Sequence, residues 1–260
     1  MKSYPTYLQT FGILLIWLLC GLLSSLLIFP FFSIESALGM LLVYTLSLIM
    51  TIAAAMRQRQ DFTLKLKKVP PGLIIVVCVS MVGMDIFLDP LLSLIPPSES
   101  YQKMLHETVQ HPIPFFFMIA VAAPVLEELL FRGVVLNGLL KNYSSPKGLV
   151  FSAFFFGLVH GNWAQGISAF IFGLFVGWIY WKTESIIPGI AAHFSTNFVS
   201  FIGTTLSKEE DLLKNFSELI GNQLVYWLLV IGAGWVAAAG VWTLHNHYFK
   251  KWKSLEVGES

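Results

Sequence analysis

The sequence has few charged residues: they make up 12% of its 260 positions, against about 25% in a typical soluble domain. Apolar residues make up 56%, and the mean hydropathy is +0.72. This balance excludes an ordinary soluble domain and indicates an integral membrane protein. The net charge is only +1, so no overall field attracts nucleic acid, and we expect the lipid bilayer rather than a nucleic acid as a partner.

Cysteine is also scarce. Cys20 and Cys78 both lie within apolar runs, so they indicate neither a disulfide framework nor a thiolate metal site. A cleavable secretory signal is not expected either. The uncharged run from Phe11 to Phe32 is longer than the apolar core of such a signal, and no small-residue cleavage motif ends it. We predict that this run is a retained transmembrane helix.

Charge-poor stretches of about 20 residues, the length that crosses a bilayer, predict about eight transmembrane helices. They lie near residues 8–32, 36–56, 71–95, 113–140, 148–163, 164–182, 185–206 and 223–245. The fifth and sixth stretches are short and nearly continuous, which predicts a tight helical hairpin or a partly re-entrant segment. No internal repeat or low-complexity linker divides the chain. We therefore expect residues 1–260 to form a single all-α domain, a polytopic membrane helix bundle.

The loop charges predict the orientation of this bundle. With the N-terminus inside, the outer loops hold only Lys103, Lys208 and Lys214. The inner segments hold Lys2, Arg57, Arg59, Lys65, Lys67, Lys68, Lys141, Lys147, Lys182, Lys250, Lys251 and Lys253. The positive-inside rule then places both termini in the cytoplasm. A compact chain without a C-terminal endoplasmic-reticulum retrieval signal favours a bacterial plasma membrane.

A few ionisable side chains remain within the predicted spans, where a charge at the helix centre costs roughly 2.5–3.5 kcal/mol. They are Asp85, Asp89, Glu127, Glu128, Arg132, His160 and His193. Each is a candidate functional residue, because such groups face a protein interior or a wet cavity. Asp85 and Asp89 lie one turn apart. They form either an ion relay or a local arrangement in which Asp89 lies at the interface and Asp85 caps or pairs nearby. We expect the local arrangement.

The fourth span carries two adjacent carboxylates, Glu127 and Glu128. Glu128 lies four residues before Arg132 on the same helix face, so the two can form an ion pair. Glu127 points about 100° away from that pair, which favours a general base or acid. Pro124 is expected to kink the helix and free backbone carbonyls toward a cavity. The alternative is an ion pair that only joins helices, which leaves Glu127 unexplained.

Two more pairs of residues are spaced by four. Phe156 and His160 lie near the end of the fifth span, where a lone histidine is often only a core residue. His193 and Asn197 project together from the seventh span, and both side chains can donate hydrogen bonds. Two converging donors predict an oxyanion hole, while the alternative is hydrogen bonding between helices.

Together, the patterns E-E-x-x-x-R, F-x-x-x-H and H-x-x-x-N on these spans resemble the CAAX-protease and bacteriocin-processing (Abi) family of intramembrane proteases, which includes the CAAX prenyl endopeptidases. The resemblance covers about residues 113–206, the expected catalytic core helices. It implies an endopeptidase that cleaves a membrane-associated or lipidated protein or peptide, in CAAX-type processing, peptide maturation or bacteriocin self-immunity. The residues that it implies are catalytic Glu127, Glu128, His160, His193 and Asn197, with Arg132 and Phe156 in support.

Within this resemblance, Glu127 assisted by His160 is expected to activate water, and His193 and Asn197 to stabilise the oxyanion. Members of the family have been named metalloproteases, and a zinc ion would use Glu127, His160 and His193. The chain has no H-E-x-x-H motif, and asparagine is a poor zinc ligand, so we expect a metal-independent site that needs no cofactor. Two other functions remain open: a transporter or ion-coupled carrier, and a non-catalytic membrane scaffold or immunity protein.

Overall fold

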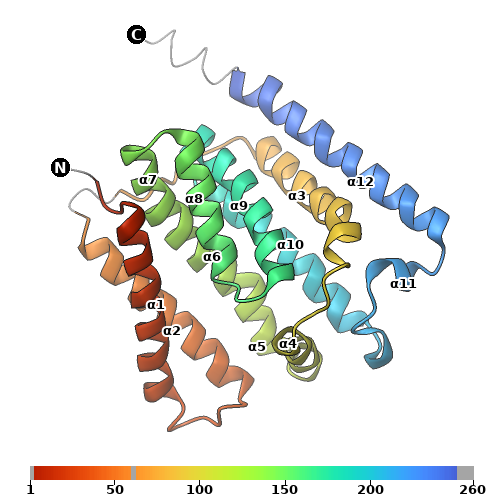
Figure 1. Ribbon diagram of the computed structural model, residues 1–260, viewed down its shortest axis with the longest axis horizontal. Helices are drawn as coiled ribbons and strands as arrows, with labels where there is room; N and C mark the ends of the chain where they lie inside the picture. The colour runs from red at the N-terminus through yellow and green to blue at the C-terminus, as the bar shows by residue number, and fades with distance from the viewer. Residues whose placement is uncertain (1–2, 60–62, 251–260) are drawn as a thin grey trace.

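The computed structural model describes residues 3–59 and 63–250, and every regular element in these residues is helical (Figure 1). The separate helices are α1 (Tyr7–Ile28), α2 (Ala37–Arg57), α3 (Pro71–Leu92), α4 (Glu99–Gln110), α8 (Ser145–Leu158), α9 (Trp163–Thr183), α10 (Ile187–Leu206), α11 (Phe216–Ile220) and α12 (Gln223–Thr243). A continuous helix is built from α5 (Pro112–Phe115), π-helical η1 (Phe116–Ala122), α6 (Ala123–Glu128), π-helical η2 (Leu129–Leu136) and α7 (Asn137–Asn142). The remaining elements are a 3₁₀ turn, η3 (Glu209–Asp211), and π-helical η4 (Leu244–Phe249).

The all-α membrane bundle predicted from the sequence is confirmed. In the described part of the chain, six helices are long and apolar enough to cross a membrane: α1, α2, α3, the continuous helix Pro112–Asn142, α9 and α12 continued by η4. The other two predicted spans are helices as well. However, α8 has 14 residues, about 21 Å at 1.5 Å per residue, which is short of a hydrocarbon core of about 30 Å. The count of eight spans therefore stays a prediction.

Loop contacts show which ends of these helices lie together. The Ile186 amide in the α9–α10 connection donates to the Lys65 carbonyl in the α2–α3 loop, and the Lys65 ammonium pairs with Glu184. At the N-terminus, the Ser3 amide donates to the Asn142 side chain at the end of α7. These are segments that the charge pattern assigns to one side of the membrane. Figure 1 also shows α1 beginning and α12 ending toward the same end of the bundle.

The cytoplasmic location of that end stays a prediction from the loop charges. Three of the basic residues that support it, Lys2, Lys251 and Lys253, lie outside the described residues. Arg59, which was counted with them as a loop charge, is instead buried. Its guanidinium donates to the Gly133 carbonyl and to the Asn137 side chain in the continuous helix, at 3.2 and 3.3 Å.

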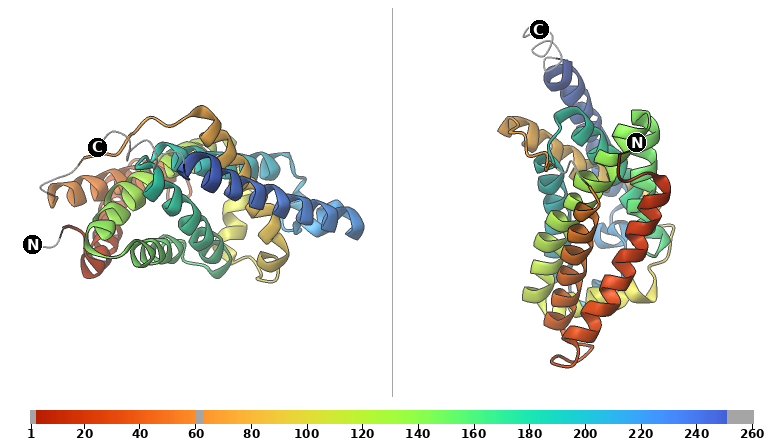
Figure 2. Two further views of the ribbon diagram at one scale, coloured as in Figure 1. Left: turned by 90° about the horizontal axis from the view of Figure 1, so that it is seen from above. Right: turned by 90° about the vertical axis from the view of Figure 1, so that its left-hand side faces the viewer.

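Three antiparallel helix pairs surround the centre of the bundle: α1 with α2, α8 with α9, and α3 with α12 (Figures 1 and 2). The continuous helix and α10 lie among these pairs, and both carry residues of the predicted site. Leucines on the outer face of α1, such as Leu18 and Leu22, remain exposed, as expected of a surface that faces lipid. The polar residues of the fourth span are instead buried, with Glu128 and Arg132 at 0% and 1% exposed.

Candidate active site

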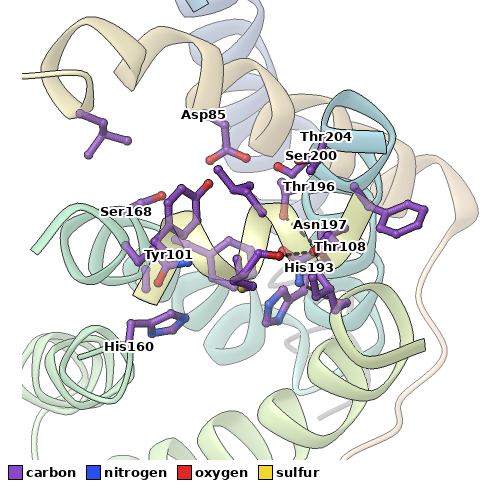
Figure 3. A pocket seen from close by; sticks show the side chains of 18 of the residues that line it. Asp85, Tyr101, Thr108, His160, Ser168, His193, Thr196, Asn197, Ser200 and Thr204 are labelled. Atoms are coloured by element: carbon purple, nitrogen blue, oxygen red, sulfur yellow. Dashed lines mark hydrogen bonds between the residues drawn. The ribbon is translucent and has the colours of Figure 1, made fainter. Parts of the chain in front are cut away.

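A cavity of about 440 Å³ lies among α3, α4, η1, α8, α9 and α10 (Figure 3). Four of the predicted site residues line it: Phe156, His160, His193 and Asn197. The other three, Glu127, Glu128 and Arg132, do not line this cavity and are buried within the bundle. The site therefore has two parts: a cavity with histidine and amide groups, and a buried layer of charged groups.

The predicted ion pair between Glu128 and Arg132 is confirmed. Arg132 Nη1 donates to Glu128 Oε1 at 2.7 Å, and both side chains are shielded from solvent. The same oxygen lies 3.4 Å from Nδ1 of His193, a charge contact that lacks hydrogen-bond geometry. Glu128 thus connects the buried layer to the cavity, because His193 is a member of both.

Aromatic rings hold the Arg132 guanidinium in place. Its carbon lies 4.7 Å from the ring centre of Phe156 and 5.5 Å from that of Phe172. Nη2 also lies 3.4 Å from the Gly173 carbonyl, which accepts its hydrogen bond. Phe156 in turn contacts both histidine rings edge-on, with centroids 5.1 Å from His160 and 5.9 Å from His193. The supporting residue of the F-x-x-x-H pattern is therefore a packing surface shared by the arginine and both histidines.

Glu127 has a partner that the sequence did not reveal. The Tyr44 hydroxyl, on α2, donates to Glu127 Oε1 at 2.5 Å, while Oε2 is buried and has no hydrogen-bond partner among the described residues. Glu127 therefore has a hydrogen-bond partner on another helix, while Arg132 pairs with Glu128. In the sequence, Tyr44 is only a polar side chain within an apolar span. Nothing in the sequence indicates that it contacts Glu127, which lies 83 positions later in the chain.

His160 lies just after α8 rather than within the predicted span. The helix ends at Leu158, Gly161 takes φ +69°, and the Asn162 side chain caps α9. This turn brings His160 to the cavity, with Nδ1 2.8 Å from the Phe156 carbonyl. Because a carbonyl only accepts hydrogen bonds, Nδ1 carries the proton in this contact, which leaves Nε2 as the acceptor of the neutral ring.

Asn197 is held by the carbonyl that Pro124 leaves without a partner. In the π-helical segment η1, the Ala123 amide donates to the carbonyl five residues earlier, that of Met118. The corresponding donor for the Ile119 carbonyl would be Pro124, which has no N–H. Asn197 Nδ2 supplies a donor instead, at 2.8 Å. A carbonyl beside the cavity is therefore available to a side chain, as predicted, through the missing N–H of Pro124 in a π-helical register; the kink at Pro124 stays a prediction.

Asp85 also lines the cavity, and its carboxylate points into it (Figure 3). It makes no hydrogen bond or ion pair within the described residues, so the expectation that it caps or pairs locally is wrong. Asp89, one turn later, accepts a hydrogen bond from the Tyr226 hydroxyl of α12 at 2.9 Å. The sequence did not predict that the Asp85 carboxylate lines the cavity without a hydrogen-bond partner, because this depends on the rotation of α3 relative to the other helices around the cavity.

Gly189 of α10 lets this helix approach the Glu128 carboxylate. A methyl group at this position would lie 2.8 Å from Glu128 Oε2 and 2.7 Å from Val176. We expect Gly189→Ala to destabilise the protein by about 1–3 kcal/mol through overpacking, and to reduce activity by shifting Glu128 and His193. Thermal unfolding in detergent, measured together with the cleavage rate, checks this.

Gly203 on the same helix is the matched control, because a methyl group there meets nothing within 4 Å. Gly203→Ala is expected to leave stability unchanged or to raise it by about 0.5–1 kcal/mol. If both substitutions changed the stability equally, the close packing of Gly189 against Glu128 and Val176 would be contradicted.

The donor set does not fit a zinc site. Among the described residues, no group of three His, Cys, Asp or Glu side chains is placed to hold a metal ion. Of the three ligands considered from the sequence, His160 and His193 line the cavity, whereas Glu127 is buried outside its lining and is bound by Tyr44, so the three do not converge on one point. We derive no step through a metal.

Comparison with known proteins agrees with the three sequence patterns. The family model described as type II CAAX prenyl endopeptidase Rce1-like matches residues 109–199, about a third of the chain. This segment is similar to the Rce1-like CAAX prenyl endopeptidases. The matched segment runs from the end of α4 into α10 and contains Glu127, Glu128, Arg132, Phe156, His160, His193 and Asn197. Comparisons with curated proteins and with solved structures gave no match.

The six apolar helices and the match to a family of membrane proteases indicate that the chain is an integral membrane protein. The Rce1-like segment ends within α10, so α1, α2, α3 and α12 lie outside it. Asp85 of α3 and Tyr44 of α2, which contact or line the site, are therefore outside the matched segment.

Proposed function

We propose that this protein is an intramembrane endopeptidase that hydrolyses a peptide bond of a membrane-associated or lipidated protein or peptide. The observation that carries the proposal is the convergence of His160, His193 and Asn197, from α10 and the turn after α8, on one cavity inside a membrane bundle. Because these side chains come from different parts of a packed bundle, their relative positions are fixed, as catalysis of peptide hydrolysis requires.

In this proposal Glu127 and His160 activate the attacking water. Nε2 of His160 is free to accept a proton, because Nδ1 is committed to a backbone carbonyl. Glu127 would act through Oε2, because Oε1 is bound by Tyr44, and the water has to enter the buried layer behind the cavity to reach it. No direct hydrogen bond joins Glu127 and His160 in the described residues, so a water molecule between them is the connection that the mechanism uses. The proton is then passed to the leaving amine, which completes hydrolysis.

The oxyanion of the tetrahedral intermediate would receive hydrogen bonds from Asn197 and His193. One N–H of the Asn197 amide is fixed by the Ile119 carbonyl, so the second N–H has a defined direction. Nδ1 of His193 faces Glu128, which leaves Nε2, when protonated, as the donor to the cavity. Each such donor contributes about 2.7–4 kcal/mol to lowering the barrier.

The same proposal includes the metal requirement, the substrate class and the cellular location. We infer a glutamate-type mechanism without a required metal, because the donor geometry serves hydrogen bonds rather than a ligand set. The substrate processes that fit are CAAX-type trimming, leader-peptide maturation and bacteriocin self-immunity, and the proposed location is a bacterial plasma membrane. Elemental analysis of active protein tests the metal assignment: stoichiometric zinc, lost together with activity on chelation, would overturn it.

Reconstitution in liposomes tests the proposed activity against its rivals. Purified wild-type protein in phosphatidylcholine vesicles is incubated with peptides from a Glu-C digest of bacterial membranes, and new peptide termini are read by mass spectrometry. We expect cleavage by the wild type, and no uptake of ions or labelled peptides into the vesicles. Uptake without cleavage would favour a transporter, and the absence of both would favour a binding protein.

A further inference from the structure

Many of the polar side chains that line the cavity are acidic or carry a hydroxyl group. Two carboxylates, those of Asp85 and Asp89, face it from α3, and hydroxyl groups line much of the rest. Among the described residues, the lining contains no lysine or arginine, and its side chains that can become cationic are His160 and His193. The nearest buried cation, Arg132, is held by Glu128 and does not line the cavity. On the α3 side of the cavity, this lining is complementary to a positively charged group.

The two carboxylates are not equivalent. Asp89 accepts a hydrogen bond from the Tyr226 hydroxyl, so part of its capacity is used within the fold. Asp85 has no hydrogen bond or ion pair within residues 3–59 and 63–250, and Figure 3 shows its oxygens directed into the cavity. Asp85 and His193 line the same cavity. An acidic side chain in a membrane-spanning helix is costly, and such a residue is a functional site by default.

Resting on the proposed function, we propose that Asp85 binds a positively charged group of the peptide substrate beside the bond that is cleaved. The group is an ammonium or guanidinium ion, provided by a lysine or arginine side chain or by a free N-terminal amine. Such an ion supplies the hydrogen-bond donors that Asp85 lacks, and a charge-assisted hydrogen bond of this kind is among the strong ones in proteins.

The position of Asp85 makes it a specificity determinant rather than a structural charge. It shares the cavity with His160, His193 and Asn197, so a cation bound there lies within the same bound peptide as the reacting carbonyl. A cavity of about 440 Å³ is within the range of ordinary ligand pockets and can hold a short peptide segment. The preference predicted is therefore local: a basic group within a few residues of the cleaved bond.

Binding and cleavage are measured separately, so that this inference and the proposed function can fail independently. For binding, the Glu127→Gln protein in phosphatidylcholine vesicles is titrated with two dye-labelled peptides that differ only in lysine against norleucine. Each peptide is made with a free and with an acetylated N-terminus, which distinguishes the two sources of positive charge. For cleavage, the wild-type protein acts on the Glu-C digest, and residues around each new terminus are counted.

We expect a charged peptide to bind at least about tenfold more tightly than its neutral counterpart, a ratio that corresponds to about 1.4 kcal/mol. Asp85→Asn should remove this preference, and Asp89→Asn, the matched control one turn away, should keep most of it. Cleaved bonds should lie preferentially within a few residues of a lysine, an arginine or the N-terminus of the peptide, and Asp85→Asn should remove this preference.

Equal or undetectable binding of the charged and neutral peptides would overturn the assignment, as would a preference that survives Asp85→Asn. Cleavage without any basic preference would leave the protease intact and remove the proposed role of Asp85. An Asp85-dependent binding preference without cleavage by the wild type would support the cation site while rejecting the protease. The isosteric Asp85→Asn change replaces a charge with a neutral group, so the variant is expected to insert and fold.

Discussion

Glu127→Gln is expected to lower the cleavage rate by about 10²–10⁴-fold while leaving the protein folded, because it removes the carboxylate that acts as a base. Glutamine keeps an Oε1 atom that can accept the hydrogen bond from the Tyr44 hydroxyl, so the contact between α2 and the continuous helix is retained. The rate is measured with purified protein in vesicles on a peptide that the wild type cleaves. Thermal unfolding in detergent verifies that the variant is intact.

Tyr44→Phe is the control for this experiment, since it removes only the hydroxyl that holds Glu127 Oε1. We expect a much smaller loss of rate, because the carboxylate itself remains. A Glu127→Gln protein that cleaves at the wild-type rate would contradict the assignment of Glu127 and leave His160 as the base. Equal losses in the two variants would indicate that orientation of Glu127, rather than its charge, is what matters.

Arg132→Met is expected to cause the largest loss of stability, about 3–5 kcal/mol, because it leaves Glu128 as an unpaired buried charge. Methionine fills much of the space between Phe156 and Phe172 but makes neither the ion pair nor the bond to the Gly173 carbonyl. Thermal unfolding in detergent measures the loss.

The double variant Glu128→Gln/Arg132→Met separates the ion pair from the packing around it. Without the carboxylate no buried charge is left unpaired, so the double variant should be more stable than Arg132→Met alone. Its catalysis should remain impaired, because the Glu128 contact with His193 is changed. Additive effects of the two substitutions would contradict a direct coupling between Glu128 and Arg132.

The sequence was a good guide wherever one helix carries both members of a pair. The four-residue spacing of Glu128 and Arg132 predicts a shared face, and the two side chains form the ion pair found in the structure. The same spacing brings His193 and Asn197 to one cavity. Apolar runs likewise predicted the helices, since about 20 residues must cross the bilayer in any arrangement.

Contacts between different helices could not be predicted from the sequence. Tyr44 reaches Glu127 from a different helix, and periodicity within either helix does not determine that contact. Asp85 is free because of how α3 faces the cavity, a matter of helix rotation that a uniformly apolar span leaves undefined. The turn that places His160 after α8 depends on Gly161, and the π-helical register before Pro124 has no simple sequence signature.

The most direct test compares the termini of membrane peptides and proteins in cells that carry the wild-type protein, the Glu127→Gln protein or neither. Mass spectrometry should find a defined set of new termini with the wild-type protein, located in or beside membrane-spanning or lipidated segments. These termini should be absent from both other membranes. The same termini in membranes with Glu127→Gln, at equal protein levels, or no new termini with the wild type, would contradict an intramembrane endopeptidase that acts through this site.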